Sequence, residues 1–129
     1  MIVFRAKNPV VVHSIKNELS SITAEELCER MVVLPDRTYV AIVVDGDDVI
    51  GHTVVSISKD SKFAYVLSTN ISYKVSREVR DYNLEKIEKW CIEEFNIHEI
   101  RTSTKVEPRV FERLYKGFKY FDATMSKKF

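Results

Sequence analysis

The chain has 129 residues, of which 45% are hydrophobic and 30% are charged, values that are ordinary for a globular protein. Its 20 lysine and arginine residues nearly balance its 19 acidic residues, so no strong net field would attract nucleic acid or an anionic membrane surface. No apolar run approaches the roughly 18 residues that a membrane-spanning helix needs. We therefore expect one domain over residues 1–129, with no nucleic-acid partner and no membrane partner.

The two cysteines, Cys28 and Cys91, are far apart in the sequence, and each falls within a helical pattern. Free thiols are therefore favoured over a disulfide or a metal site. No group of His, Cys, Asp and Glu residues has the spacing of metal ligands, so we expect no metal. These features, and the lack of an apolar leader at the N-terminus, indicate a cytoplasmic protein or one packaged in a particle made in the cytoplasm.

The N-terminal region begins with a β-rich run at residues 2–6, which predicts a short strand. Asn8 and Pro9 then supply a cap and a first-turn proline for a helix that runs to about Leu19. The region therefore starts with one strand and one helix.

A second short helix is predicted from the capping box that Thr23 and Glu26 form. Pro35 ends this helix. Its apolar side is supplied by Ile22, Leu27, Cys28 and Met31.

The strongest local pattern is a β-hairpin. Residues 38–44 and 49–57 are rich in β-branched side chains, and an Asp-Gly-Asp-Asp turn separates them. A second turn at residues 59–62 leads into a third strand over residues 63–75. Three consecutive antiparallel strands are therefore expected.

Ser76 caps a long helix in which apolar residues recur at steps of three and four. The apolar side consists of Leu84, Ile87, Cys91 and Phe95, with Trp90 beside them. The opposite face is charged, and we expect it to be solvated; it consists of Glu85, Lys86, Glu88, Lys89, Glu93 and Glu94.

After this helix the sequence predicts a strand at residues 99–105, a helix that starts at Pro108 and stops at Gly117, and a last strand at residues 118–125. The order β-α-α-β-β-β-α-β-α-β predicts an α/β (α+β) fold with a mixed, mostly antiparallel central sheet flanked by helices. The long helix should connect two parallel neighbouring strands.

This order of elements resembles the GNAT N-acetyltransferase superfamily. Residues 39–51, with Asp45-Gly46 in the turn and Gly51 in the second strand, are similar to the family's β-hairpin. Residues 114–118, Leu-Tyr-Lys-Gly-Phe, are similar to its aromatic glycine-phenylalanine signature. Residues 63–95 occupy the place of the strand and helix that bind acetyl-CoA in the family.

The resemblance implies Ile71, Tyr73, Ser76, Arg77 and Arg80 as candidates for contact with acetyl-CoA. In the family an Arg/Gln-x-x-Gly-x-Gly/Ala loop lets backbone amides close on the pyrophosphate at a helix N-terminus. The corresponding stretch here, residues 76–83, contains no glycine and two acidic residues. We therefore expect no cofactor in this chain, or acetyl-CoA if it is active.

The family's catalytic residues also have few counterparts. Its strand carboxylate has none in residues 63–75, and the place of its asparagine falls near residues 105–106. A gap-free match puts Arg113 in the place of the tyrosine acid, and Tyr115 takes this place only if the loop is shorter. Tyr115 is therefore the catalytic candidate, and its alternative role is packing.

The three histidines do not form an obvious catalytic set. His98 and Glu99 are adjacent in a predicted strand, so their side chains should leave opposite faces of the sheet. His13 and His52 are isolated in the sequence. Nothing in the sequence suggests a Ser/His/Asp or a Cys/His arrangement.

Two functional hypotheses follow. In the first, the chain is a GNAT-like scaffold with a degraded acetyl-CoA site that acts as a structural or protein-interaction component. It then resembles, loosely, the small GNAT-like internal virion proteins of tailed phages. In the second, it is a divergent acetyl-CoA-dependent N-acetyltransferase that acts on an amine, with Tyr115 or a water molecule as proton carrier.

The C-terminal region predicts a partner. The family closes its sheet with a hairpin, but residues 118–129 suggest one strand and a basic tail, with the second strand missing. An uncovered edge would pair with another protein chain, by strand addition or by docking of Phe129. The alternative is that Lys119, Lys127 and Lys128 protect a solvated edge.

Overall fold

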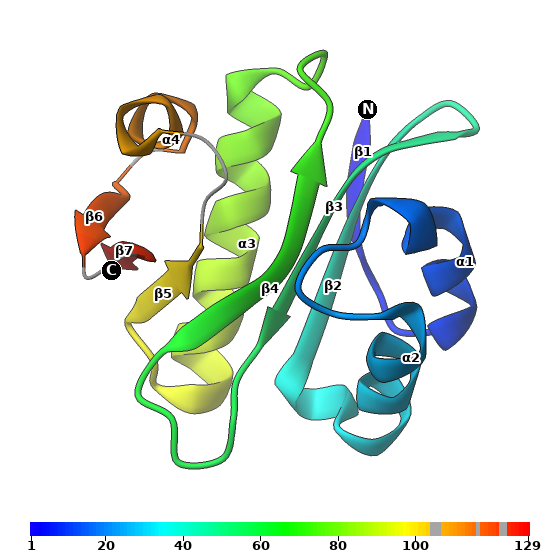
Figure 1. Ribbon diagram of the computed structural model, residues 1–129, viewed down its shortest axis with the longest axis horizontal. Coiled ribbons are helices and arrows are strands. Elements are labelled where there is room, and N and C mark those ends of the chain that lie inside the picture. Colours follow the sequence, from blue (N-terminus) through cyan, green and yellow to red (C-terminus); the bar gives the residue numbers. More distant parts are fainter. Residues whose placement is uncertain (104–106, 116, 122–123) are drawn as a thin grey trace. The chain divides into compact units, whose positions relative to one another are not determined.

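The computed structural model describes residues 1–103, 107–115, 117–121 and 124–129 (Figure 1). Contacts group the chain into a first unit, Met1–Ser56 with Leu67–Val75, and a second unit, Ile57–Val66 with Ser76–Phe129. The strands are β1 Ile2–Ala6, β2 Thr38–Asp45, β3 Asp48–Ser56, β4 Ala64–Ile71, β5 Glu99–Thr102, β6 Lys119–Phe121 and β7 Thr124–Lys128. The helices are η1 Pro9–Val11, α1 Val12–Ile15, η2 Lys16–Glu18, α2 Ala24–Val33, η3 Pro35–Arg37, α3 Arg77–Phe95 and α4 Pro108–Leu114.

The predicted fold class is confirmed. The sheet has the strand order β1-β2-β3-β4-β5-β7-β6. Strands β1 and β2, β2 and β3, β5 and β7, and β6 and β7 pair antiparallel, whereas β4 and β5 pair parallel. Helix α3 connects the two parallel strands, as the sequence predicts, because a parallel pair cannot be joined by a tight turn.

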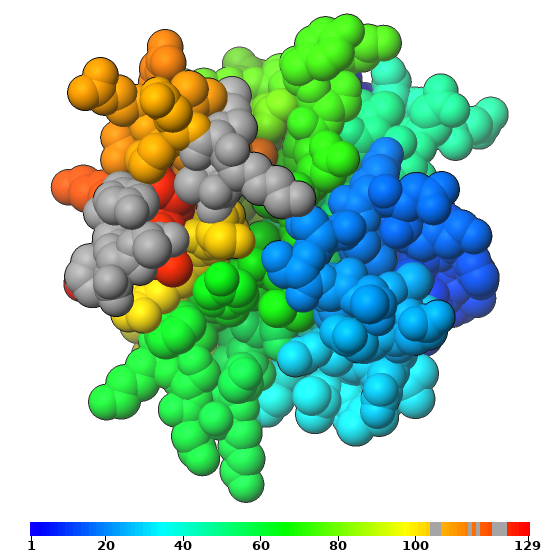
Figure 2. Space-filling view, viewed as in Figure 1, coloured from blue at the N-terminus to red at the C-terminus, as the bar shows by residue number. Residues whose placement is uncertain are grey.

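In the first unit, α1 and α2 cover one face of β2 and β3 (Figures 1 and 2). Side chains that alternate along the strands meet the helices, so Val40 and Ile42 of β2 and Val54 of β3 are almost fully buried. The remaining buried members of this core are Val12, Ile15, Ile22, Leu27 and Met31. The predicted apolar side of α2 therefore packs as expected.

The predicted local signals of the first unit are present as hydrogen bonds. The Asn8 side chain accepts from the Val10 amide at 3.0 Å, and the Thr23 hydroxyl accepts from the Glu26 amide at 3.1 Å. Gly46 has φ +62° in the β2–β3 turn, a conformation that glycine adopts without strain.

The prediction of one continuous helix from Pro9 to Leu19 is wrong. The segment consists instead of η1, the single turn α1, and η2. Three consecutive valines at positions 10–12 disfavour a regular helix because β-branched side chains lose rotamer freedom there. At Ile15 the backbone leaves helical geometry with φ −124° and ψ 0°.

In the second unit, α3 begins after Ser76 and ends at Phe95, and the next residue, Asn96, caps it with φ +53°. Ile87, Trp90 and Cys91 are buried on its inner face, and the Trp90 and Phe95 rings meet edge to face at 5.3 Å. Burial, with a smaller effect from the charge of Glu88, raises the pKa of the Cys91 thiol to about 12. Cys91 is therefore a protonated structural thiol.

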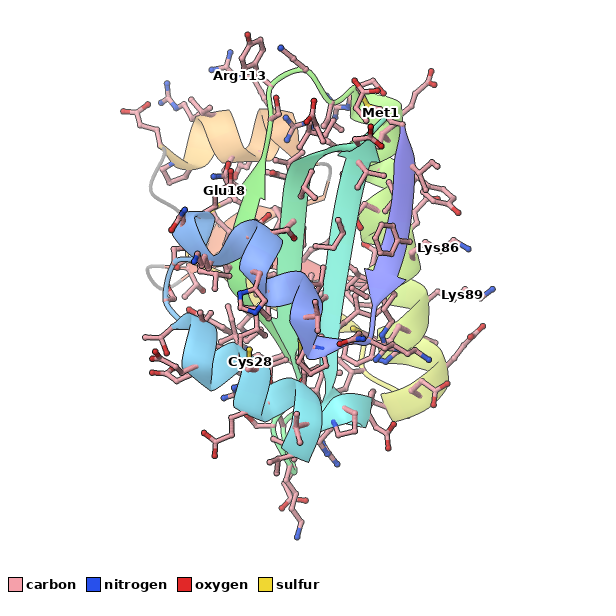
Figure 3. All side chains as sticks on the ribbon, turned by 90° about the vertical axis from the view of Figure 1, so that its right-hand side faces the viewer. Met1, Glu18, Cys28, Lys86, Lys89 and Arg113 are labelled. Carbon is pink, nitrogen blue, oxygen red and sulfur yellow. The ribbon has the colours of Figure 1, made fainter. Side chains whose placement is uncertain are left out.

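The charged face of α3 is solvated as predicted at Lys86 and Lys89, which project away from the helix (Figure 3). For Glu88 the prediction is wrong. Its side chain is only 14% exposed and forms an ion pair with Lys127 of β7, itself 17% exposed. Glu88 follows the buried Ile87 directly, at the boundary between the two faces of the helix, so its carboxylate reaches the sheet rather than the solvent.

Gly117 lies against the side chain of Lys127. It has φ +88°, and a Cβ atom on it would lie 2.7 Å from Cε of Lys127. A larger residue would therefore be strained in its backbone and would displace the lysine stem. The predicted helix stop at Gly117 is wrong in position, because α4 ends at Leu114 with Tyr115 as its cap; Gly117 instead leaves room for Lys127.

The predicted loss of one C-terminal strand is wrong. Both β6 and β7 are present, and β7 lies between β5 and β6. They are only three and five residues long, so the twelve residues after Gly117 suffice for a complete hairpin. The predicted strand at residues 99–105 ends at Thr102, and residues 105–106 lie outside the described residues.

Candidate functional site

The site predicted from the sequence is centred on the N-terminus of α3. Ser76 has extended backbone geometry, and its hydroxyl accepts a hydrogen bond from the Val79 amide at 3.3 Å. The Arg80 amide donates to the Ser76 carbonyl at 3.1 Å, which closes the first turn. Ser76 thus forms an ordinary helix cap, and one of the amides that could meet an anion is already bonded within the chain.

Arg77 is the exposed cation of this helix start. Its side chain is 60% exposed, and its Nε atom lies 4.0 Å from Oδ2 of Asp81, one turn further along α3. Its Nη1 atom donates to the Arg113 carbonyl of α4 at 3.0 Å. The guanidinium therefore joins two helices and stands beside a carboxylate that offsets its charge.

Arg80 is buried, with 8% of its surface exposed. Its Nη1 atom donates to the Tyr115 hydroxyl oxygen at 3.2 Å, and its guanidinium lies 5.8 Å from the centroid of the same ring. A buried guanidinium needs such partners because an unpaired buried charge is costly. This burial was not foreseen from the sequence, where Arg80 stands among charged neighbours.

Tyr115 is positioned by an aromatic cluster at the end of α4. Its ring centroid lies 4.8 Å from that of Phe111 and 6.4 Å from that of Phe118, and these two phenylalanines meet at 5.2 Å. Its hydroxyl accepts from Arg80, so its own proton remains available for donation. Tyr115 therefore packs against two phenylalanine rings, and a hydrogen bond from Arg80 fixes the position of its hydroxyl.

The other two candidates belong to the first unit. Ile71 ends β4 and packs against Gly51 of β3, where an added Cβ atom would lie 3.3 Å from three Ile71 atoms. Tyr73 follows in a turn closed by the Val75 amide and the Ser72 carbonyl, and it is 86% exposed. Of the predicted set, the structure brings together Ser76, Arg77, Arg80 and Tyr115 through α3 and α4, all within the second unit.

His98 and Glu99 have separate partners, although His98 lies outside the strand, because β5 begins at Glu99. The His98 ring bonds to the Phe129 carbonyl at 3.0 Å and to the Asn96 side chain at 3.1 Å. Glu99 accepts from Arg101 at 2.6 Å and from the Ser126 hydroxyl at 2.8 Å. The bond from Arg101 is the main reason that the pKa of Glu99 is lowered.

Sequence reasoning missed a polar group inside the first unit. His52 of β3 is fully buried, and its Nε2 atom lies 2.7 Å from the hydroxyl of Ser68 in β4. Its Nδ1 atom lies 3.8 Å from Oε2 of Glu18. The available signal was the alternation of Ile50, His52 and Val54, which puts the histidine on the buried face of the strand.

The part of the chain that the structure describes contains no group of three or more His, Cys, Asp or Glu residues that could hold a metal ion. Within the same residues, no helix has both the length and the apolarity that crossing a membrane requires.

Compared by sequence, the chain matches no protein-family model and no curated protein. Compared by structure, it is similar to the PaiA N-acetyltransferase from Thermoplasma acidophilum in complex with coenzyme A, with TM-score 0.75, 16% identity and full coverage of both chains. It is also similar to an acetyltransferase of the GNAT family from Streptococcus pneumoniae, with TM-score 0.71, 11% identity and 98% of each chain covered. A third similar structure holds mutant forms of the spermidine/spermine N-acetyltransferase SpeG from Vibrio cholerae, with TM-score 0.66, 14% identity and coverage of 98% of this chain and 93% of that one. The chain therefore has the fold of the GNAT acetyltransferases.

Proposed function

We propose that this chain is a GNAT-fold protein with a degraded acetyl-CoA site, which acts as a structural or protein-interaction component in the cytoplasm or inside a phage virion. One observation carries the proposal. The polar groups that the fold would offer to the cofactor's pyrophosphate are engaged within the chain: Ser76 with Val79, Arg77 with Asp81 and Arg113, and Arg80 with Tyr115.

The residues present do not fit a pyrophosphate well. Side chains on all residues from 76 to 83 keep an anion away from the helix amides that glycine would leave open. A carboxylate about 4 Å from a phosphate charge costs on the order of 4 kcal/mol at an effective dielectric near 20, and Glu78 is exposed in this turn. Arg80 could meet the anion only by giving up its bond to Tyr115 and leaving its buried position.

The first expected result concerns acetyl-CoA. Millimolar acetyl-CoA should leave the melting temperature of the full chain unchanged in a thermal-shift titration. Binding to the native state at 100 times the dissociation constant would add about 2.7 kcal/mol, which a domain of this size shows as a shift of several degrees.

The Thermoplasma acetyltransferase of the same fold, whose structure holds coenzyme A, is the positive control. An Arg77→Ala variant is the matched control on this chain, because under the proposal it responds to acetyl-CoA no differently from the wild type. A dose-dependent rise in the melting temperature that Arg77→Ala abolishes would overturn the proposal.

The alternative is a divergent acetyl-CoA-dependent N-acetyltransferase acting on an amine. The observation that favours it is the Tyr115 hydroxyl, which accepts from Arg80 and keeps its own proton for a departing thiolate. The three structural neighbours named above are acetyltransferases by name. Release of free thiol from acetyl-CoA in the presence of a polyamine, with a lower turnover number but unchanged binding in Tyr115→Phe, would support this alternative.

The interaction surface that we propose is the C-terminal edge. Strand β6 ends the described strand order, and its outer edge would accept a strand of another protein chain. Docking of Phe129 into a neighbour has less support, because the Phe129 amide donates to the His98 carbonyl at 2.6 Å and its carbonyl bonds to the His98 ring.

Light scattering tests this edge. We expect the full chain to form a complex, with itself at micromolar concentration or with a co-purifying protein, and Tyr120→Lys to abolish it because a lysine on an edge strand opposes strand addition. Tyr73→Lys adds the same charge at an exposed turn and should leave the complex intact. A monomer without partner in the wild type, or equal loss in both variants, contradicts the proposed edge.

A further inference from the structure

A buried series of hydrogen bonds in the first unit links three segments. Strand β3 contributes His52, strand β4 contributes Ser68, and the connection of residues 19–23 between η2 and α2 contributes the Ser20 amide. The Ser20 amide donates to the Ser68 hydroxyl oxygen at 3.2 Å, and the same oxygen lies 2.7 Å from Nε2 of His52. His52 and Ser68 are 0% and 2% exposed.

The protons in these hydrogen bonds can be assigned. The Ser68 oxygen accepts from Ser20, and its second lone pair and its hydrogen leave it able either to accept from Nε2 of His52 or to donate to it. We assign Nε2 as the acceptor, with the proton of the neutral ring on Nδ1. This tautomer directs Nδ1–H toward the Glu18 carboxylate at 3.8 Å, whereas the other tautomer would direct a lone pair there.

Protonation of His52 removes the acceptor for the Ser68 hydroxyl. Nε2 would gain a hydrogen and face the Ser68 hydroxyl, whose oxygen lies 2.7 Å away, so the hydroxyl hydrogen would have to turn toward buried surroundings. The Ser68 oxygen would then have to accept from both His52 and Ser20. Each change weakens the bond that holds the 19–23 connection on β4.

The 19–23 connection carries backbone strain that favours release. Ser21 has φ +62°, a left-handed conformation that costs a residue with a side chain and persists only where neighbouring contacts enforce it. The hydrogen bond of Ser20 to Ser68 is adjacent to this residue. We propose that His52 is an acid-sensitive latch for the 19–23 connection, and that its protonation releases this connection from β4 while the strands of the first unit stay folded.

Few groups around His52 could stabilise its protonated, charged form. Strand β2 opposes it with Ile42 and β4 with Ser68, and α1 packs against β3 through the apolar Val12 and Ile15. On α1 and η2 the titratable groups are His13, Lys16 and Glu18, all exposed. Of these, the Glu18 carboxylate lies within 4 Å of the ring, and it is 46% exposed to solvent.

The direction of the pH effect follows from burial. Desolvation lowers the pKa of His52 from 6.5 to about 4, so the closed state prefers the neutral ring. When the 19–23 connection opens, the ring gains contact with water and its pKa rises toward its ordinary value. The latch is therefore fully effective above pH 6.5 and is lost as the pH falls toward 4.

Amide hydrogen exchange of the full chain, followed residue by residue by NMR, tests the latch. The protection factor of the Ser20 amide should fall by about tenfold or more between pH 7.5 and pH 5, because the open state binds a proton that burial excludes from the closed state. Low concentrations of urea should leave Ser20 exchange unchanged and accelerate exchange of the Ile42 amide in β2, since a local opening exposes little surface.

Variants separate the latch from other causes. His52→Gln should keep an acceptor for Ser68 and lose the pH dependence, whereas His13→Gln, at an exposed histidine, should keep it. Ser68→Ala should leave the Ser20 amide poorly protected at both pH values. Protection that does not change with pH, an unchanged pH dependence in His52→Gln, or equal urea dependence for Ser20 and Ile42 would overturn the proposal.

Discussion

Ile87→Ala is expected to lower the free energy of unfolding by about 2–5 kcal/mol, because it opens a cavity in a close-packed core. Ile87 is 1% exposed and stands on the inner face of α3 with Trp90 and Cys91. The loss combines the transfer free energy of the removed carbon atoms with the free-energy cost of the cavity that they leave. Urea denaturation followed by the fluorescence of the buried Trp90 measures it.

Ile92→Ala is the matched control, because it makes the same chemical change on the same helix at a side chain that is 39% exposed. It should cost less than about 1 kcal/mol, mainly through lost partial burial. If Ile92→Ala destabilises the protein as much as Ile87→Ala, the buried face of α3 has been assigned incorrectly.

Glu88→Ala is expected to cost about 3 kcal/mol, although a helix residue flanked by charges suggests an exposed position. The change leaves the Lys127 ammonium largely buried without its carboxylate, and the loss of one member of a buried ion pair is far costlier than the loss of a surface pair. The measurement is chemical denaturation at neutral pH.

Glu93→Ala provides the comparison. Glu93 pairs with Lys89 at 3.8 Å, but both side chains are more than half exposed, so the change should lie within about half a kcal/mol of zero. Equal costs for Glu88→Ala and Glu93→Ala would show that the Glu88–Lys127 pair is solvated in solution. The double variant Glu88→Lys with Lys127→Glu should recover part of the loss if the pair itself is responsible.

Much of the fold was predictable because its signals are local. The caps at Thr23 and Ser76 and the turn at Gly46 each depend on residues within a few positions of one another, and each appears in the structure as a hydrogen bond or a positive φ. The order of elements follows from these signals and from hydrophobic periodicity.

The features that sequence reasoning missed depend on residues far apart in the chain. Glu88 is buried because β7 brings Lys127 to α3, and Arg80 is buried because α4 brings Tyr115 to it. A pattern read along one helix cannot show such partners. The C-terminal hairpin escaped prediction for another reason, since β6 has only three residues, fewer than the four to eight over which alternation is recognised.

The candidate site, too, was predictable from the sequence only in part. Ser76 was identifiable from its capping pattern alone. The partners of Arg77 and Arg80 required the position of α4. The contact of the buried His52 with Ser68 and its approach to the exposed Glu18 required the pairing of β3 with β4 and the path of η2.

The turn after β4 has a consequence for proteolysis. An endopeptidase needs an accessible side chain in a segment that it can draw into an extended conformation, and exposed turns satisfy both conditions. Tyr73 is 86% exposed in a turn closed by the bond between Val75 and Ser72. An enzyme that cleaves after aromatic residues would thus divide the sequence between β4 and α3, and a binding partner that covers Tyr73 would protect that bond from cleavage.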